Sequence, residues 1–213
     1  MINCLSTCLL LVGLVINTTV SFAQKISVES GEQTAGFSFM ADNNVTEPVI
    51  YYRQNIEMLS PTADKASLSI YGDGRVLVHY PVYMKKAGDY EMQLEPAELV
   101  DLIQTLSGNG ILDFDEVRVK KNIQSYEKTL RAKGLLHEVS DAVVTLIDIR
   151  LDEYQKNSST IKNNSYRKSF RWHNIEHVAK RFKQDVDINN ANRSVLDLKA
   201  LMDDARLVKM ERR

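Results

Sequence analysis

Residues Ser67–Tyr80 read SLSIYGDGRVLVHY, and this stretch decides the architecture of the chain. On each side of the glycines every second residue is apolar, which is the pattern of two strands that each bury one face. Gly72-Asp73-Gly74 separates the two runs, and an Asp-Gly pair is a strong hairpin signal because both residues tolerate positive φ. We therefore predict an antiparallel hairpin here. A calcium loop needs several oxygen ligands at fixed spacing, and Asp73 stands alone.

More strand signals surround this hairpin, and a helix follows them. Val49–Tyr52 is rich in β-forming residues, and residues 90–95 alternate again after a turn at Lys85–Asp89. The period then changes, because Pro96 stands where a first helical residue would and apolar residues follow at helical spacing (Leu99, Leu102, Ile103 and Leu106). Gly108-Asn109-Gly110 predicts the end of that helix.

The second half of the chain contains a later strand pair and two closing helices. Val139–Leu151 is the strongest strand pattern, and residues 166–172 alternate in the same way. Helical apolar spacing then predicts one helix over residues 172–182 and another over 195–208. Phe114–Lys133 is highly charged, and two interpretations are open for it, a helix and a partly ordered connection.

This order of elements predicts the α+β class: an antiparallel sheet, made of the meander and the later strand pair, covered by amphipathic helices. We expect a signal peptide at 1–23, a flexible N-terminal arm at 24–46 and an α+β domain at 47–213. Two subdomains, at about 47–112 and 135–213, are an alternative division of that domain. The arm is predicted from its polar composition, since only Phe37–Met40 is apolar within it.

The N-terminus predicts export. Cys8–Ile16 is an apolar run of the length of a signal-peptide core, and Ser21 and Ala23 match a small-residue cleavage pattern, so we place the cut after Ala23. The alternative is an uncleaved membrane anchor. Its apolar stretch of about 16 residues is shorter than the roughly 20 that a spanning helix needs. We therefore expect a periplasmic or secreted protein with no membrane span after cleavage.

Composition excludes several classes of protein. The chain has 213 residues, of which 26% are charged and 44% hydrophobic, and this balance excludes intrinsic disorder and a multi-span membrane protein. Its net charge of −1 gives no basic excess, so we expect no nucleic-acid partner. Both cysteines, Cys4 and Cys8, lie in the expected signal peptide, so the mature chain would have no thiol nucleophile, thiolate metal site or disulfide.

Charge is unevenly distributed along the chain. Residues 45–116 contain 5 basic and 12 acidic side chains, whereas residues 162–213 contain 13 basic and 7 acidic ones. The asymmetry is compatible with an acidic or nucleic-acid partner for the C-terminal part. We favour complementarity within the molecule, because the basic residues are interspersed with aspartates.

The sharpest chemical motif is His173-Asn174-Ile175-Glu176-His177, which has the H-x-x-E-H form of inverzincin metallopeptidases. Histidines four residues apart on a helix share a face that Zn²⁺ can bridge, and Glu176 could activate a metal-bound water. Two observations oppose this interpretation. Only 36 residues follow His177 to supply a third ligand, and a helical wheel places both imidazoles opposite the apolar stripe, beside Lys180.

No other motif indicates a catalytic centre. The chain has no Gly-x-Ser-x-Gly elbow, Walker loop or Rossmann glycine pattern, and His79 and His137 have no partner in the sequence. Asp141 and Asp148 begin or interrupt a strand, which a cap or surface role explains. Several tyrosines gather in the meander, where strand packing explains them better than a stacking surface for a ligand (Tyr51, Tyr52, Tyr71, Tyr80, Tyr83 and Tyr90).

Two segments resemble known proteins. Ile70–Val76 reads IYGDGRV and Leu94–Leu102 reads LEPAELVDL, and together they resemble small bacterial exported domains with an IYGDG-V hairpin and an L-P-x-E-L helix start. Emfourin-type inhibitors of metallopeptidases are a more distant comparison that shares only the strands-plus-helix character. The resemblance implies a fold and assigns no catalytic residue, and it covers nothing beyond Trp172.

These observations favour a non-enzymatic exported protein that binds another exported or envelope protein, or acts as an envelope accessory factor, with no cofactor. A metal-dependent hydrolase is the alternative, with Glu176 as its catalytic residue and His173 and His177 as its metal ligands. Binding of a small ligand or glycan by the tyrosine-rich meander is a second alternative.

Overall fold

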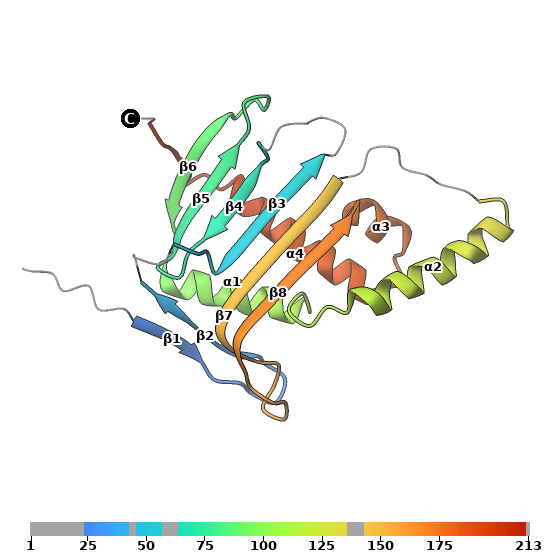
Figure 1. Cartoon of the computed structure of the whole chain (residues 1–213), viewed down its shortest axis with the longest axis horizontal. Helices are drawn as coiled ribbons and strands as arrows, with labels where there is room; N and C mark the ends of the chain where they lie inside the picture. Colours follow the sequence, from blue (N-terminus) through green and yellow to red (C-terminus); the bar gives the residue numbers. More distant parts are fainter. Residues whose placement is uncertain (1–23, 43–45, 57–63, 136–142, 212–213) are drawn as a thin grey trace, which may run out of the picture.

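One antiparallel sheet organises the molecule. The computed structural model describes residues 24–42, 46–56, 64–135 and 143–211, and their nine strands join a single sheet (Figure 1). In chain order the strands are β1 (Gln24–Val28), β2 (Gly36–Ala41), β3 (Ile50–Ile56), β4 (Ser67–Ile70), β5 (Arg75–Tyr80), β6 (Gly88–Gln93), β7 (Val143–Gln155), β8 (Asn163–His173) and β9 (Val208–Lys209).

Strand β7 holds the sheet together because it has three neighbours. Along one edge it pairs with β8 for nearly its whole length, from Val144 to Tyr154. Along the other edge its first half pairs with β3, and its last residues, Glu153–Gln155, pair with β2. From β3 the sheet continues through β4, β5 and β6 to β9, while β1 pairs with β2 alone. The meander and the later strand pair therefore share one sheet.

Four helices cover one face of this sheet. They are α1 (Pro96–Gly108), α2 (Glu116–Ala132), α3 (Ile175–Arg181) and α4 (Val186–Met202), and α1 and α4 cross behind the strands in Figure 1. The core lies between the two layers, and its members include Ile50, Leu68, Ile70, Val76, Ile147, Ile149, Phe170 and Trp172 from the strands and Leu99, Ile103, Val119, Ile188, Val195 and Leu198 from the helices. Because successive strand residues face opposite sides, every second side chain of the sheet enters this core.

Local sequence explains where the helices begin. Pro96 opens α1, and the side chains of Glu95 and Glu98 form a capping box around it. The Asp115 carboxylate accepts a hydrogen bond from the N–H of Arg118 at 2.9 Å and caps α2. The Asp185 carboxylate accepts one from the N–H of Ile188 at 3.0 Å and caps α4. The fold class expected from the sequence is confirmed, and residues 114–133 contain the helix α2.

The flexible arm expected at 24–46 is wrong. Residues 24–28 and 36–41 are β1 and β2, and the rings of Phe37 and Phe39 are 2% and 1% exposed. Gly36–Ser38 pair with the far end of β7. The polar composition misled the prediction because a long partner strand and two buried phenylalanines suffice to order a short polar segment.

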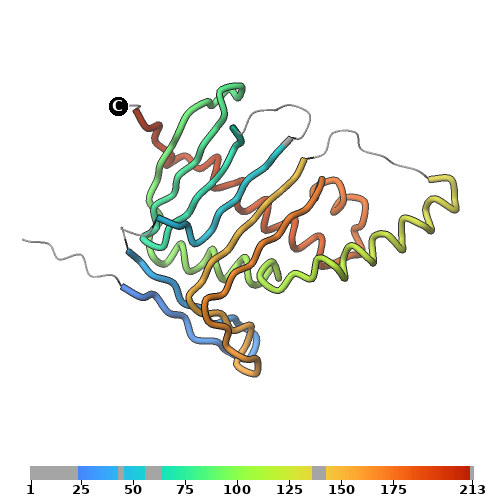
Figure 2. The backbone as a smooth tube through the Cα atoms, in the orientation of Figure 1, coloured from blue at the N-terminus to red at the C-terminus, as the bar shows by residue number. Residues whose placement is uncertain are grey.

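Two helix predictions at the C-terminal end need correction. The stripe beginning at Trp172 was assigned to a helix, but Trp172 belongs to β8 and α3 begins at Ile175. The last helix was extended to Val208, but α4 ends at Met202 and Val208 lies in β9. The chain then runs beside β6, as the tube in Figure 2 shows, because Val208 and Lys209 pair with Glu91 and Tyr90.

Several predictions fall outside the described residues, namely the signal peptide with Cys4 and Cys8, His137 and Asp141. Within the described ranges, no helix combines the length and the apolar character that a membrane crossing requires.

Candidate functional site

None of the helices in the described ranges lies on the second face of the sheet, which we call the open face. Its side chains alternate with the core residues along each strand, and they include Tyr51, Ser67, Ser69, Leu77, His79, Asp89 and Asp148. Most of them are half-buried rather than fully exposed. These side chains are therefore partly accessible to a partner.

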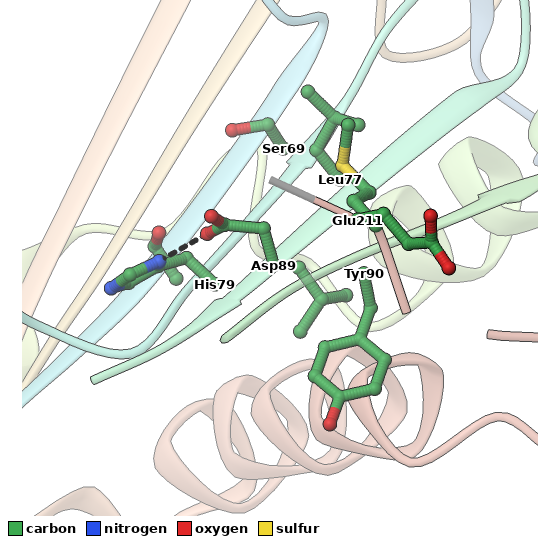
Figure 3. A pocket seen from close by; sticks show the side chains of 9 residues that line it. Ser69, Leu77, His79, Asp89, Tyr90 and Glu211 are labelled. Carbon is green, nitrogen blue, oxygen red and sulfur yellow. Dashed lines mark hydrogen bonds and ion pairs between the residues drawn. The ribbon is translucent and has the colours of Figure 1, made fainter. Parts of the chain in front are cut away.

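A hollow lies on the open face where β4, β5 and β6 meet the C-terminal segment (Figure 3). Its volume is about 430 Å³, and we call it the His79 hollow. The side chains that define it are Ser67, Ser69, Leu77, His79, Asp89, Met210 and Glu211.

Strand register brings these side chains together. His79 lies directly opposite Ser67 on β4 and opposite Asp89 on β6. The C-terminal segment is held against β6 because the N–H of Met210 donates to the carbonyl oxygen of Asp89 at 2.8 Å. The sheet thus supplies the floor of the His79 hollow, and Met210 and Glu211 bound it at the edge strand.

His79 is the most constrained titratable group of the hollow. Its Nδ1 lies 2.5 Å from Asp89 Oδ1, and its Nε2 lies 2.5 Å from Asp64 Oδ1. The hydrogen bond with Asp89 raises the pKa of His79 most, the bond with Asp64 also raises it, and desolvation opposes both. A carboxylate at each ring nitrogen stabilises the doubly protonated imidazolium relative to the neutral ring.

The hollow and its rim are acidic. Asp64 and Asp89 flank His79, and Glu91 and Glu211 lie beside the same strand pair. Among the described residues, Glu91 and Glu211 form no ion pair. Leu77 and Met210 beside these carboxylates could accommodate a cationic group that carries an aliphatic stem.

The structure separates the two histidines of the H-x-x-E-H motif. His173 is the last residue of β8, whereas His177 lies in α3, so the expectation of two imidazoles on one helix face is wrong. Asn174 causes the break, because it adopts φ +50° between the strand and the helix. Its backbone N–H donates to the Val143 carbonyl oxygen, and its side-chain oxygen accepts from the Val143 N–H, both at 2.7 Å.

Glu176, the catalytic residue of the hydrolase alternative, forms an ion pair. Its Oε1 lies 2.6 Å from the Lys199 Nζ of α4. Glu176 and His177 line a second cavity of about 330 Å³, together with Thr145, Lys180 and Lys199. We call it the α3–α4 cavity. The described part of the chain contains no cluster of three or more histidine, cysteine, aspartate or glutamate side chains suited to a metal ion.

The tyrosines of the meander do not share one surface. Tyr52 and Tyr80 are buried on the helix side of the sheet, while Tyr51 lies on the open face and Tyr83 is 51% exposed in the turn after β5. The Tyr80 hydroxyl donates to the Met202 carbonyl oxygen at 2.6 Å, which is a structural contact. A single aromatic surface for a ligand is therefore not formed by these residues.

Sequence reasoning missed the His79 cluster because it treated His79 as isolated. The available signal was the spacing of the hairpin after Tyr80, which sets His79 opposite Asp89. The contact with Asp64 could not be predicted from strand spacing, because Asp64 lies in the segment before β4 and not in a strand. Comparison with protein-family models, curated proteins and solved structures finds no match to this chain, so the assignment of the site rests on its geometry.

Proposed function

We propose that this chain is an exported, non-enzymatic accessory protein that binds another protein through the open face of its sheet. In this proposal a lysine or arginine side chain of the partner occupies the His79 hollow. The observation that carries the proposal is the combination, in one depression of the open face, of the apolar side chains Leu77 and Met210 with Glu211, a carboxylate that forms no ion pair with a described residue. The signal peptide expected at residues 1–23 would bring the chain to an exported or envelope partner.

The hollow fits a long cationic side chain in two respects. Leu77 and Met210 provide apolar surface for the methylene stem, and Asp89 and Glu211 lie within the same depression to contact the charged head. A hydrogen bond between a cation and a carboxylate is stronger than a neutral one, and it selects against acidic partners.

The open face also fits an extended backbone beside the hollow. Ser67 and Ser69 on β4 are short side chains, so a segment can approach this part of the sheet closely. The partner expected here is therefore a basic, extended segment of a protein rather than a free small molecule.

A peptide titration tests this proposal. The peptide Thr-Val-Lys-Val-Thr, blocked at both ends, is added to the ¹⁵N-labelled protein, and parallel titrations use norleucine or glutamate in place of lysine. We expect the lysine peptide to shift amide signals of β4, β5, β6 and residues 208–211. The norleucine peptide should bind more weakly, and the glutamate peptide should not bind.

Two variants distinguish the effect of a charge in the His79 hollow from the effect of the net charge of the protein. Glu211→Gln should weaken binding of the lysine peptide by about two- to fivefold, the effect of a partly exposed ion pair. Asp101→Asn removes the same charge from α1, in the helix layer, and should leave binding unchanged. Equal binding of the lysine and glutamate peptides, or signal shifts confined to the helices, would contradict the proposal.

A further inference from the structure

We propose that the α3–α4 cavity binds a small organic anion with a carboxylate or phosphate at one end and a hydrogen-bond acceptor at the other. This cavity is separate from the His79 hollow, since the two share no lining residue and lie on opposite sides of the sheet. The inference therefore does not depend on the proposed protein-binding function.

The first observation is a buried hydroxyl group that lacks a partner. Thr145 on β7 is 0% exposed and lines the cavity, yet its Oγ1 has no hydrogen-bond partner anywhere in the described ranges. Its neighbour on β3 is Gln54, which also lines the cavity. Buried polar groups in folded proteins are nearly always hydrogen-bonded, so an unsatisfied hydroxyl facing a cavity indicates a missing acceptor.

A second buried hydroxyl without a described partner belongs to Tyr52, which precedes the lining residue Gln54 by two positions on β3. The Tyr52 side chain is 1% exposed, and its hydroxyl likewise has no partner within the described part of the chain. Burial raises the pKa of Tyr52, and the negative charge of Glu176 raises it further. The Tyr52 hydroxyl therefore keeps its proton and can donate, and Glu176, which lines the cavity, is its electrostatic neighbour.

The third observation is the charge at the cavity mouth. Lys180 of α3 and Lys199 of α4 both line it, and Glu176 is the only carboxylate among the described lining residues. The charge of Lys199 is neutralised by its ion pair with Glu176. The charge of Lys180 therefore gives the cavity lining a net excess of one positive charge. An anionic group is therefore favoured at this end of the cavity.

The size of the cavity matches a small metabolite. Its volume of about 330 Å³ lies at the lower end of the range for ligand pockets. A ligand anchored by its anionic group at Lys180 and Lys199 would direct its second polar group towards Thr145. The competing explanation is that ordered water alone fills the space and satisfies the hydroxyls.

Calorimetric titration of the full protein with four probes tests the proposal. Succinate carries a carboxylate at each end, and glycerol 3-phosphate carries a phosphate and hydroxyls. Inorganic phosphate has the anion without the second end, and 1,4-butanediol has the length without the charge. We expect saturable binding of succinate or of glycerol 3-phosphate, and the tighter of the two identifies which anion the site prefers.

Variants then locate the binding. Lys180→Met should weaken binding of the preferred probe by about tenfold or more, while Lys183→Met, which removes the same charge outside the cavity, should leave it unchanged. Thr145→Val should also weaken binding by about tenfold. In the absence of probe it should not lower the free energy of unfolding, because it removes an unsatisfied hydroxyl and keeps the shape.

Three results would overturn the proposal. The first is that no probe saturates below ~10 mM, a concentration that corresponds to negligible affinity. The second is that 1,4-butanediol binds as tightly as succinate, or inorganic phosphate as tightly as glycerol 3-phosphate. The third is that Thr145→Val destabilises the free protein and leaves probe binding intact, which is the result expected if water alone completes the site.

Discussion

At the scale of single residues, His79 links three segments of the molecule. The ring belongs to β5, while its carboxylate partners come from β6 and from the segment before β4. Protonated His79 therefore joins these segments by two ion pairs, and neutral His79 loses both. The charge of His79 therefore strengthens the contacts that join these three segments.

This arrangement predicts a pH-dependent stability. The pKa of His79 is raised in the folded protein, so its stabilising contribution is complete below its ordinary value of about 6.5 and is lost as pH rises through the raised value. His79→Gln should lower the free energy of unfolding by up to about 1 kcal/mol at pH 6, as expected for partly exposed ion pairs. The difference from the wild type should vanish at alkaline pH.

Urea denaturation of the wild type and the variant across this pH range checks the prediction. His177→Gln is the matched control, because His177 is exposed and makes no ion pair with a described residue. A difference between wild type and His79→Gln that does not change with pH would show that the charge of His79 makes no contribution.

Gly72 is required for a close approach between two segments. A Cβ atom there would lie 1.9 Å from the carbonyl oxygen of Met40, so the hairpin turn could not remain against β2. Gly72→Ala should destabilise the protein by about 1–3 kcal/mol, the usual cost of overpacking. Gly108→Ala, at the end of α1 with nothing within 4 Å of the new Cβ, should instead stabilise it by about 0.5 kcal/mol. Thermal denaturation distinguishes the two outcomes, and equal effects would contradict the packing described here.

At the scale of elements, β2 is an integral part of the sheet. Phe39 is 1% exposed, and its ring lies 6.3 Å from that of Phe37 in a stacked arrangement. Phe39→Ala should therefore cost about 3–5 kcal/mol of folding free energy, as for other buried aromatic residues. Leu196→Ala on α4, where the side chain is 47% exposed, should change stability by less than about 0.5 kcal/mol.

Chemical denaturation of these two variants measures whether residues 36–41 are structural. If Phe39→Ala were as stable as Leu196→Ala, the N-terminal segment would be the loosely packed arm that its composition suggests. The structure predicts the opposite order.

The elements that the sequence predicted well are those with a strong internal period. Strand β7 alternates from Thr145 to Leu151, and α1 begins at Pro96 as expected. Strands β2 and β9 could not be predicted, because they are short and gain their order from partners far away in the chain. A short strand that is ordered by a distant partner has too few residues of its own for a clear alternation of apolar and polar side chains.

The two cavities were also not predictable from local sequence patterns alone. Glu176 and His177 belong to the H-x-x-E-H pattern, and both line the α3–α4 cavity. The pattern does not form a metal site of the expected kind, because Asn174 interrupts the helix that the two histidines would have to share. Glu176 shares the lining of this cavity with Thr145 of β7 and Lys199 of α4, and it forms an ion pair with Lys199. Their proximity follows from the packing of α3 and α4 on the sheet, which no spacing in the sequence encodes.

At the scale of the whole molecule, the asymmetry of charge is partly resolved by contacts within the chain. Arg206 of the basic C-terminal part pairs with Glu98 of the acidic part at 2.8 Å, and Arg167 lies 3.8 Å from Glu47. These contacts support complementarity within the molecule. Around the His79 hollow, Asp64 and Asp89 contact His79, whereas Glu91 and Glu211 form no ion pair with a described residue.

The two layers of the molecule have different surfaces. The helices cover one side of the sheet completely enough to bury its apolar residues, while the other side remains accessible with its serines, Leu77 and His79. An accessible sheet face is common in antiparallel proteins. The acidic hollow, with Leu77 in its floor, is the feature on which the proposed binding function rests.

Photo-cross-linking in cells that produce the full chain tests this central claim most directly. Benzoylphenylalanine is placed at Leu77 on the open face and, in a matched experiment, at Leu196 on the helix layer. We predict that the Leu77 position forms a discrete adduct with another exported or envelope protein, that the adduct is lost with Glu211→Gln and Asp89→Asn combined, and that the Leu196 position forms none. Adducts of equal yield at both positions, or at Leu196 alone, would contradict the account.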